Sequence, residues 1–320
     1  MRAAMSHKFG REYGRGSLPW VEDGSASGHF LGNPSVGLVV SEYMISLRRR
    51  KVHSGEVVTS ARAIDNTIIK KLYDLMIEQA KSNKPDYSPV SRRAKEESPE
   101  SWAGSNLREM LHALYLIAFF CLLRFDEALR IEWHWITIEP VPGKPEKARI
   151  RLQLPYRKTH QTGGISPFIL YGNSNKPWLD PVLAVCKWRM STLSLGLPAE
   201  GFVFRRRFGS QVSDHFEKQM SDDSFLECFR NSLCDIHVNP QPYGTHSFRR
   251  GGAQYLVKSL RWPITRVCSW GGWSDRGEMG TLFKYLVSWT DEAVDREDYF
   301  NPDKQTTERC PTCGRSCMCS

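Results

Sequence analysis

Hydrophobic residues recur at helical spacing in two early stretches of the chain. In the first, Asn33-Pro34 is typical of a helix start, and the apolar positions that follow are Val36, Val39, Val40, Tyr43, Met44 and Leu47. In the second, a helix is expected from about Ser60, with an apolar face formed by Ile64, Ile68, Leu72, Leu75 and Met76. This spacing predicts a small helical domain over residues 33–80.

A stronger apolar pattern begins at Ser105 and continues through Phe120. Its apolar run is too short to cross a bilayer, so it predicts a buried helix. After Trp135, apolar and polar residues alternate, which predicts strands at residues 136–138, 148–154 and 166–171. The spacing becomes helical again from Pro181. We therefore expect an α+β domain over residues 105–302 that is mainly helical and carries a small antiparallel sheet.

Three other segments have compositions unlike a packed core. Residues 1–32 are rich in Gly, Ser and charge, which predicts disorder. Residues 81–104 contain Pro85, Pro89 and Pro99 among many charges, which is typical of a linker. Residues 303–320 form a Cys-rich tail.

The overall charge favours a polyanionic partner. The chain has 44 Lys and Arg against 35 Asp and Glu, a formal charge of +9. Each basic side chain that meets a phosphate releases a condensed counterion, although many basic proteins bind no nucleic acid. The first residues carry no apolar segment of the kind found in secretory signals. We expect an intracellular protein with no membrane partner, nuclear if the source is eukaryotic.

The nine cysteines fall into two groups. Five are scattered among apolar residues, as reduced core thiols are. The other four crowd the C-terminal tail at Cys310, Cys313, Cys317 and Cys319. Four thiolates suffice for one tetrahedral zinc ion, but the spacing is tighter than in a typical zinc ribbon. The tail is either a structural zinc site or an oxidation-prone end.

Five separate segments carry candidate chemistry. Arg124 ends the apolar helix, and Glu127 follows one turn later, where its carboxylate can orient a guanidinium toward a phosphate. Lys158 follows a predicted strand. At a predicted helix start, His246 and Arg249 share one face near backbone N–H groups that favour an anion. The remaining candidates are Trp273, after two glycines, and Tyr285, among apolar residues.

Each segment alone has an ordinary explanation, such as a surface salt bridge or a core aromatic residue. Together and in this order, they resemble the active site of the tyrosine recombinase family. Trp273 in place of a second His is similar to Cre-type recombinases. The upstream segment from Gly32-Asn33-Pro34 through Gly55-Glu56 to Ser60-Ala61-Arg62 resembles the Crypton branch of eukaryotic mobile elements.

The resemblance implies a recombinase catalytic domain preceded by a short helical DNA-clamping domain. It implies Tyr285 as the nucleophile, with Arg124 and Arg249 holding the non-bridging phosphate oxygens. Lys158 would protonate the leaving 5′ oxygen, and His246 would help to remove the tyrosyl proton. Trp273 would donate its indole N–H, and Glu127 would orient the arginine side of the site. It also implies double-stranded DNA as partner, a homo-oligomer on that DNA, and catalysis without a metal or other cofactor.

Several points stay open at this stage. A shift of one position would exchange Lys158 with Arg157, or Arg249 with Arg250, and His160 is a weaker alternative to Lys158. Trp273 and Tyr285 are twelve positions apart (285 − 273), about three more than in the Cre-like pattern. If Tyr285 is not the nucleophile, Tyr299 is the next candidate.

Two basic runs are candidates for contact with the DNA backbone. They are Arg48, Arg49, Arg50 and Lys51 in the first domain, and Arg205, Arg206 and Arg207 in the second. Either run would also suit a solvated surface. Two functions compete with recombination: relaxation of DNA by a type IB topoisomerase, and DNA binding by a domesticated protein that no longer cuts.

Overall fold

A computed structural model of the chain describes residues 2–16, 18–54, 61–81, 102–157, 164–208, 211–273, 282 and 285–286. The chain divides into two compact units, residues 1–59 and residues 60–320. The candidate chemistry lies in the second unit. The expected linker lies almost wholly outside the described residues, and the Cys-rich tail lies wholly outside them.

Unit 1 is built from short elements around one long helix. These are α1 (Arg2–His7), η1 (Lys8–Glu12), β1 (Val21–Glu22), β2 (Phe30–Leu31), η2 (Pro34–Val36) and α2 (Leu38–His53). The buried side chain of Asn33 joins them: it accepts from the Ser35 N–H and donates to the carbonyls of Ser6 and Gly16. Asn33 caps the first turn as expected. These hydrogen bonds tie Ser6 and Gly16 to η2, and the expected disorder of residues 1–32 stays a prediction.

Unit 2 contains nearly all of the buried apolar residues. Its helices are α3 (Asn66–Lys81), α5 (Ser105–Phe120), α6 (Phe125–Leu129), η4 (Trp133–Trp135), η5 (Pro177–Leu179), α7 (Pro181–Ser194), α8 (Asp222–Asp235), α9 (Ser247–Gln254), η6 (Tyr255–Ser259) and α10 (Ile264–Gly271). Its strands are β3 (Ile136–Val141), β4 (Lys144–Leu152), β5 (Phe168–Tyr171), β6 (Arg207–Phe208) and β7 (Gln211–Val212).

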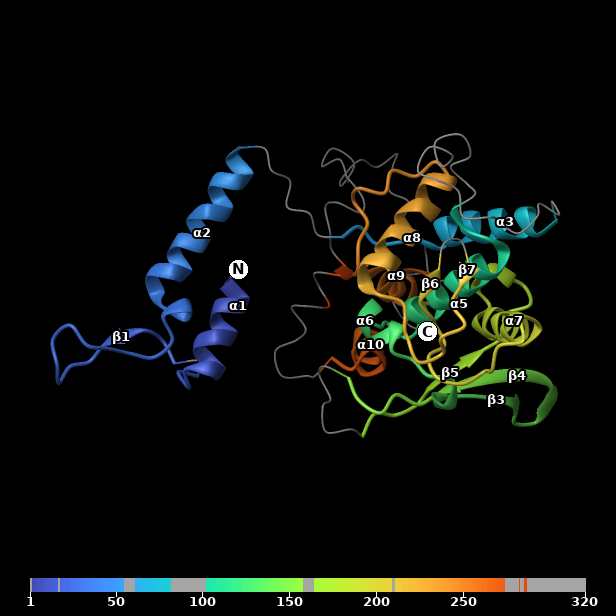
Figure 1. Cartoon of the computed structure of the whole chain (residues 1–320), viewed down its shortest axis with the longest axis horizontal. Coiled ribbons are helices and arrows are strands. Elements are labelled where there is room, and N and C mark those ends of the chain that lie inside the picture. Colours follow the sequence, from blue (N-terminus) through green and yellow to red (C-terminus); the bar gives the residue numbers. More distant parts are fainter. Residues whose placement is uncertain are drawn as a thin grey trace, which may run out of the picture. The chain divides into compact units, whose positions relative to one another are not determined.

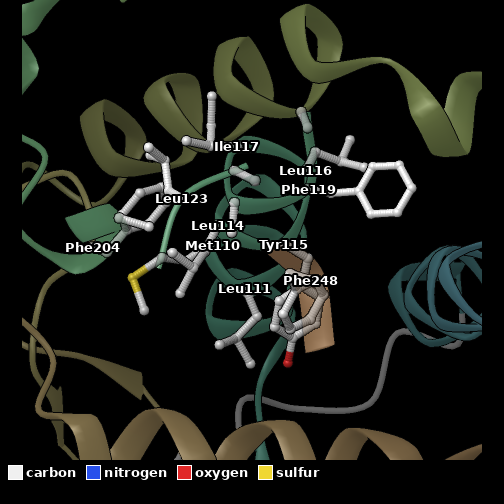
Figure 2. Packing of buried hydrophobic residues seen from close by; sticks show 14 of the residues in the cluster. Met110, Leu111, Leu114, Tyr115, Leu116, Ile117, Phe119, Leu123, Phe204 and Phe248 are labelled. Carbon is white, nitrogen blue, oxygen red and sulfur yellow. The ribbon is translucent and has the colours of Figure 1, made fainter. Parts of the chain in front are cut away.

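The helix α5 forms the centre of unit 2. Its residues from Met110 to Phe119 are all buried, and Figure 2 shows their side chains packed together with Phe204 and Phe248. Helices α3, α7 and α9 pack against it. The expectation of a buried helix over this apolar run is confirmed.

The helix α3 belongs to unit 2, whereas the sequence placed it in a domain with the preceding helix. Its apolar face, with Ile68, Ile69 and Leu72, is part of the same core as α5. It also begins at Asn66 and not near Ser60. The Asp65 carboxylate accepts from the backbone N–H groups of Thr67 and Ile68, so it caps the helix there.

The strands β3, β4 and β5 form an antiparallel sheet in that order, as the alternation predicts. Ile150 pairs with Ile138 on one side and Leu170 on the other. Ile150 and Leu170 are buried with the α5 core, and Figure 1 shows the sheet beside α7. The expected mainly helical α+β class with a small antiparallel sheet is confirmed.

Candidate active site

The carboxylate of Glu127 is the meeting point of three arginines. Its Oε1 lies 3.3 Å from Arg124 Nη1, and its Oε2 lies 3.3 Å from Arg157 Nη2 and 3.8 Å from Arg249 Nη1. Glu127 also accepts from the Arg124 backbone N–H at 3.0 Å, which closes the first turn of α6. Three guanidiniums facing one carboxylate leave two positive charges in excess at this place.

The ionisation of Glu127 depends on these neighbours. Burial alone would raise the pKa of its carboxyl group, but the charge of Arg157 opposes burial most strongly, followed by the Arg124 N–H and the charges of Arg249 and Arg124. The outcome is a pKa below the usual value. Glu127 is therefore an anion at neutral pH and a fixed counter-ion for the arginines.

A turn after α5 brings two of the arginines together. Leu122 has a φ of 50°, unusual for a residue other than glycine. Its carbonyl oxygen accepts from Arg249 Nη1 at 2.7 Å and from Arg157 Nη2 at 3.4 Å. This backbone oxygen therefore helps to fix two guanidiniums that come from different segments of the chain.

Two glycines let α9 lie directly on its neighbours. A Cβ atom on Gly251 would lie 1.9 Å from the Ile64 carbonyl oxygen, and one on Gly252 would lie 1.9 Å from that of Phe119. Real Cβ atoms do not approach backbone so closely. Gly-Gly thus seats α9 against α5, the helix that leads into the Leu122 turn.

The position of α9 places Arg249, and not Arg250, in the candidate site. Arg249 is 1% exposed and points toward Leu122 and Glu127. Arg250 is also buried, but its guanidinium donates to the Ala61 carbonyl. The two side chains therefore serve different neighbours, and only Arg249 joins the candidate site. Burial lowers the pKa of Arg249 to about 10.

His246 stands at the N-cap position of α9 and is partly buried. Burial, together with the positive charges of Arg124 and Arg249, lowers the pKa of its imidazole. The ring is therefore neutral at pH 7 and able to accept a proton. Its Nδ1 is buried and has no hydrogen-bond partner among the described residues.

Trp273 is brought to the site by the end of α10. Gly272 has a φ of 66°, and the Trp273 N–H donates to the Cys268 carbonyl at 2.9 Å, which closes the helix with a reversal that favours glycine. The indole ring lies under Arg249, with 4.7 Å between the guanidinium carbon and the ring centroid. Its buried Nε1 has no acceptor within the described part of the chain.

Tyr285 belongs to the same cluster. Its ring centroid lies 5.8 Å from that of Trp273 and 5.9 Å from the Arg249 guanidinium carbon. Its backbone carbonyl accepts from Gln254 Nε2, at the end of α9, at 2.8 Å. Despite the long segment between Trp273 and Tyr285, the two aromatic rings lie side by side.

The site thus contains six of the seven residues predicted to be catalytic. The structure gathers Arg124, Glu127, His246, Arg249, Trp273 and Tyr285. Lys158 lies outside the described residues, as do His160 and Tyr299.

Sequence reasoning missed the position of Arg157, which it treated only as a substitute for Lys158. Leu152 and Leu154 are buried, so simple alternation would place Tyr156 inside and Arg157 outside. Instead Tyr156 is 51% exposed and Arg157 only 2%. The strand β4 ends at Leu152 and Pro155 follows, so the alternation no longer applies. Pro155, shortly after the end of the strand, was the available signal.

The basic run at residues 205–207 corrects the predicted DNA contacts. Arg205 is fully buried, and its guanidinium donates to the backbone carbonyls of Pro198, Glu200 and Phe202. It therefore holds its own loop and does not face DNA. Arg207 forms an ion pair with Glu227 at 3.0 Å, and only Arg206 is exposed.

The other predicted contacts are tested only in part. In unit 1, Arg49 and Arg50 are exposed on α2, and the side chains of Arg48 and Lys51 lie outside the described residues. The four cysteines of the predicted zinc site do so as well. Within the described residues, no group of three or more His, Cys, Asp or Glu side chains is arranged to hold a metal ion. Nor does any helix there have the length and apolar character needed to cross a membrane.

Comparisons with known proteins give a resemblance in fold. No family model matches the chain, and no curated protein matches it. Among solved structures, the chain is similar to the XerH site-specific recombinase bound to its difH substrate in a pre-cleavage complex, with a TM-score of 0.43 and 13% identity over 74% of this chain and 53% of that one. The post-cleavage complex of XerH with palindromic difH has a TM-score of 0.42 and 12% identity, over 70% and 49%. The chain thus spans about half the length of these recombinases, at 53% and 49%.

Proposed function

We propose that this chain is a tyrosine recombinase, which cuts and rejoins DNA through a covalent bond between Tyr285 and a DNA phosphate. The observation that carries the proposal is the arrangement around Arg249. Its guanidinium lies between the rings of Tyr285 and Trp273 on one hand and the Glu127 carboxylate on the other. A nucleophile candidate therefore stands beside a site with excess positive charge.

The chemistry of the site favours a phosphodiester over other anions. Buried donors at Trp273 Nε1 and Arg249 Nε have no acceptor among the described residues. A buried donor without an acceptor is costly, so these groups favour a ligand that brings several oxygens. Guanidiniums match the geometry of phosphate oxygens, and the formal charge of +9 suits a long polyanion such as DNA.

The proposed reaction is a transesterification. The Tyr285 oxygen forms a bond to phosphorus while the bond from phosphorus to the 5′ oxygen breaks, which leaves a 3′-phosphotyrosyl link and a free 5′-hydroxyl. Arg124 and Arg249 stabilise the charge that builds on the non-bridging oxygens. Rejoining reverses the step, so the bond energy is kept and no ATP is needed.

Two residues manage protons in this proposal. The neutral His246 accepts the tyrosyl proton, in keeping with its lowered pKa. Lys158 gives a proton to the leaving 5′ oxygen. Trp273 donates its indole N–H to a phosphate oxygen, and Glu127 orients the arginines.

Catalysis without a metal is part of the same proposal. The two arginines that face the phosphate supply positive charge where some nucleases use divalent ions. We further propose that the chain acts as a homo-oligomer on double-stranded DNA inside the cell, in the nucleus if the source is eukaryotic. A Crypton-type origin and a zinc site in the Cys-rich tail stay predictions.

The decisive experiment traps the covalent intermediate. A pool of random-sequence duplexes, each with one nick, lets the short 5′-hydroxyl fragment diffuse away after cleavage, so that adducts accumulate. Adducts resistant to denaturant are then recovered and sequenced, which also identifies the target. We expect adducts from the wild-type chain in excess EDTA, and none from Tyr285→Phe, which lacks one oxygen and should bind DNA normally.

Other outcomes point to other functions. An adduct that persists in Tyr285→Phe would move the nucleophile, with Tyr299 next in line. Adducts that need magnesium would contradict the proposed mechanism. Relaxation of supercoiled DNA without strand exchange would favour a topoisomerase, and DNA binding without adducts would favour a domesticated protein.

A further inference from the structure

Arg157 is buried in the candidate site, yet the proposed reaction gives it no step. It is 2% exposed and lines two cavities. One, of about 450 Å³, also contacts Glu127 and Arg130, and the other, of about 320 Å³, contacts Ser269 and Arg266. A guanidinium in this position borders both cavities, and its desolvation requires compensation by nearby acceptors.

Those acceptors come from three segments of the chain. Arg157 Nη1 donates to the Gly271 carbonyl at 3.0 Å, two residues before Trp273. Arg157 Nη2 donates to the Leu122 carbonyl at 3.4 Å and to Glu127 Oε2 at 3.3 Å. Arg157 thus joins the end of α10, the turn after α5 and the helix α6, and each of these carries or precedes a residue of the site.

The three arginines of the site differ in what their donors do. Both terminal nitrogens of Arg157 are bonded within the protein. Arg124 has a side chain that is 23% exposed and is paired only with Glu127 among the described residues. Arg249 Nη1 donates to the Leu122 carbonyl, and Arg249 and Arg157 each keep a buried Nε for which the described residues offer no acceptor. Arg157 therefore differs from the other two in the bonding of its terminal nitrogens, which are committed to the Gly271 carbonyl and to Glu127.

We propose that Arg157 is a positioning residue that acts as the structural counter-ion of Glu127 and thereby leaves Arg124 and Arg249 available to the phosphate. The inference rests on the proposed function of this site. Without Arg157, the Glu127 carboxylate would draw the two remaining guanidiniums toward itself. They would then compete for Glu127 instead of clamping the phosphate in the transition state.

Four variants test this role. Their cleavage rates are measured in single-turnover reactions on the DNA target that the trapping experiment identifies. We expect Arg157→Met to slow cleavage about 100-fold with little change in DNA affinity, because the loss falls on the transition state. Arg157→Lys should recover part of the rate, since one ammonium restores the charge without the fork. Glu127→Gln should slow cleavage in the wild-type background. The same change should accelerate the Arg157→Met variant, because it removes the unpaired carboxylate.

The pH profile separates this role from simple packing. Glu127 faces Arg124, Arg157 and Arg249, while Asp126 and Arg130 line the same cavity. Arg157→Met removes the largest charge that lowers the pKa of Glu127, so that pKa rises. Protonation then frees Arg124 and Arg249. The rate of Arg157→Met relative to wild type should therefore improve as the pH falls, and this ratio cancels the titration of His246. For Arg157→Met/Glu127→Gln, the rate relative to wild type should not change with pH.

A second measurement needs no DNA and keeps the two proposals distinguishable. A carboxyl group with a lowered pKa stabilises the fold above its unfolded pKa and loses this contribution as the pH falls. The difference in unfolding free energy between wild type and Arg157→Met should therefore grow from acid to neutral pH. It should not grow between Glu127→Gln and Arg157→Met/Glu127→Gln, because both variants lack the carboxylate. If the wild-type chain forms no adduct but this pattern appears, the proposed function fails while the ion pair stands.

Arg108→Met is the matched control. Arg108 is 6% exposed and pairs with Asp235 at 2.9 Å, so it is also a buried arginine with one carboxylate. Its loss should destabilise the chain but leave the pH ratio of cleavage unchanged.

A sulfur substitution at the bridging 5′ oxygen completes the test. Sulfur leaves without an acid, so this substrate should restore cleavage by Lys158→Ala but not by Arg157→Met. Recovery of Arg157→Met would make Arg157 the acid and overturn the proposal. A loss that is independent of pH and unaffected by Glu127→Gln would overturn it too, because Arg157 would then be only a packing residue.

Discussion

Unit 2 contains two sets of three arginines whose side chains are arranged in opposite ways. Arg124, Arg157 and Arg249 are far apart in the sequence and converge on one carboxylate. Residues 205–207 are consecutive arginines, and they separate: one is buried, one is exposed and one is paired with Glu227. A run of charges on the chain is therefore not a patch on the surface.

The difference lies in how the guanidinium donors are satisfied. Arg205 meets three backbone carbonyls, which are neutral and local in sequence. The convergent set shares one carboxylate and the carbonyls of Leu122 and Gly271, which are too few acceptors for three forks. A guanidinium that bonds mainly to the carbonyls of its own loop supports the fold, while guanidiniums from separate segments that share one carboxylate form a positively charged site.

The largest effect is expected at the convergent set. Arg249→Ala and Arg124→Ala should each slow covalent adduct formation by about 100-fold or more, because each stabilises charge formed in the transition state. DNA affinity should change far less, as measured by titration at fixed salt. Equal losses of rate and affinity would show that these arginines only contact the DNA backbone. The contrast with residues 205–207 would then disappear.

The family resemblance of the sequence named six residues that the structure brings together, but it did not give the position of Arg157. The buried α5 and the alternating strands follow from hydrophobic periodicity, since burial on one face or all round leaves that trace. The sequence also placed a helix start at His246, which is the N-cap residue of α9. The position of Arg157 did not follow, because the alternation lapses after Leu152 and tertiary hydrogen bonds then decide which side chain turns inward.

The other departures have similar causes. Arg205 is buried because its loop presents three carbonyls to it, and no local pattern records that. The helix α3 joins the core of α5 because an amphipathic face does not specify its partner. Lys158 remains a prediction.

A second, smaller effect is expected where α9 is seated. Gly252→Ala would place a Cβ atom 1.9 Å from the Phe119 carbonyl oxygen, so α9 must shift away from α5. Overpacking of this kind costs about 1–3 kcal/mol of unfolding free energy. Arg249 is part of α9 and would shift with the helix, so the rate of adduct formation should fall as well. A Gly252→Ala chain with a normal rate and normal stability in urea would show that the convergence does not depend on this contact.

At Arg205 we expect an effect on stability alone. Arg205→Met would remove the donors for three backbone carbonyls in a buried position. Such losses cost about 1–3 kcal/mol per unsatisfied group, offset in part because a buried charge is also removed. Chemical denaturation should report the lower stability, while the cleavage rate of the folded chain should stay unchanged. A specific loss of DNA affinity would return Arg205 to the DNA-binding surface.

The smallest effect is expected at the exposed member of the run. Arg206 is exposed, whereas Arg207 is held by Glu227. If DNA passes this loop, Arg206→Ala should reduce the slope of log affinity against log salt by about 0.9, the value for one phosphate contact. Arg207→Ala should reduce it less, because the ion pair with Glu227 already neutralises that guanidinium. Glu227→Gln would release Arg207 from its ion pair and should increase the slope. Arg207→Ala and Glu227→Gln together therefore compare the absence of Arg207 with its unpaired form. Equal slopes for Arg206→Ala, Glu227→Gln and wild type would place the loop away from DNA, and residues 205–207 would then contribute to the fold alone.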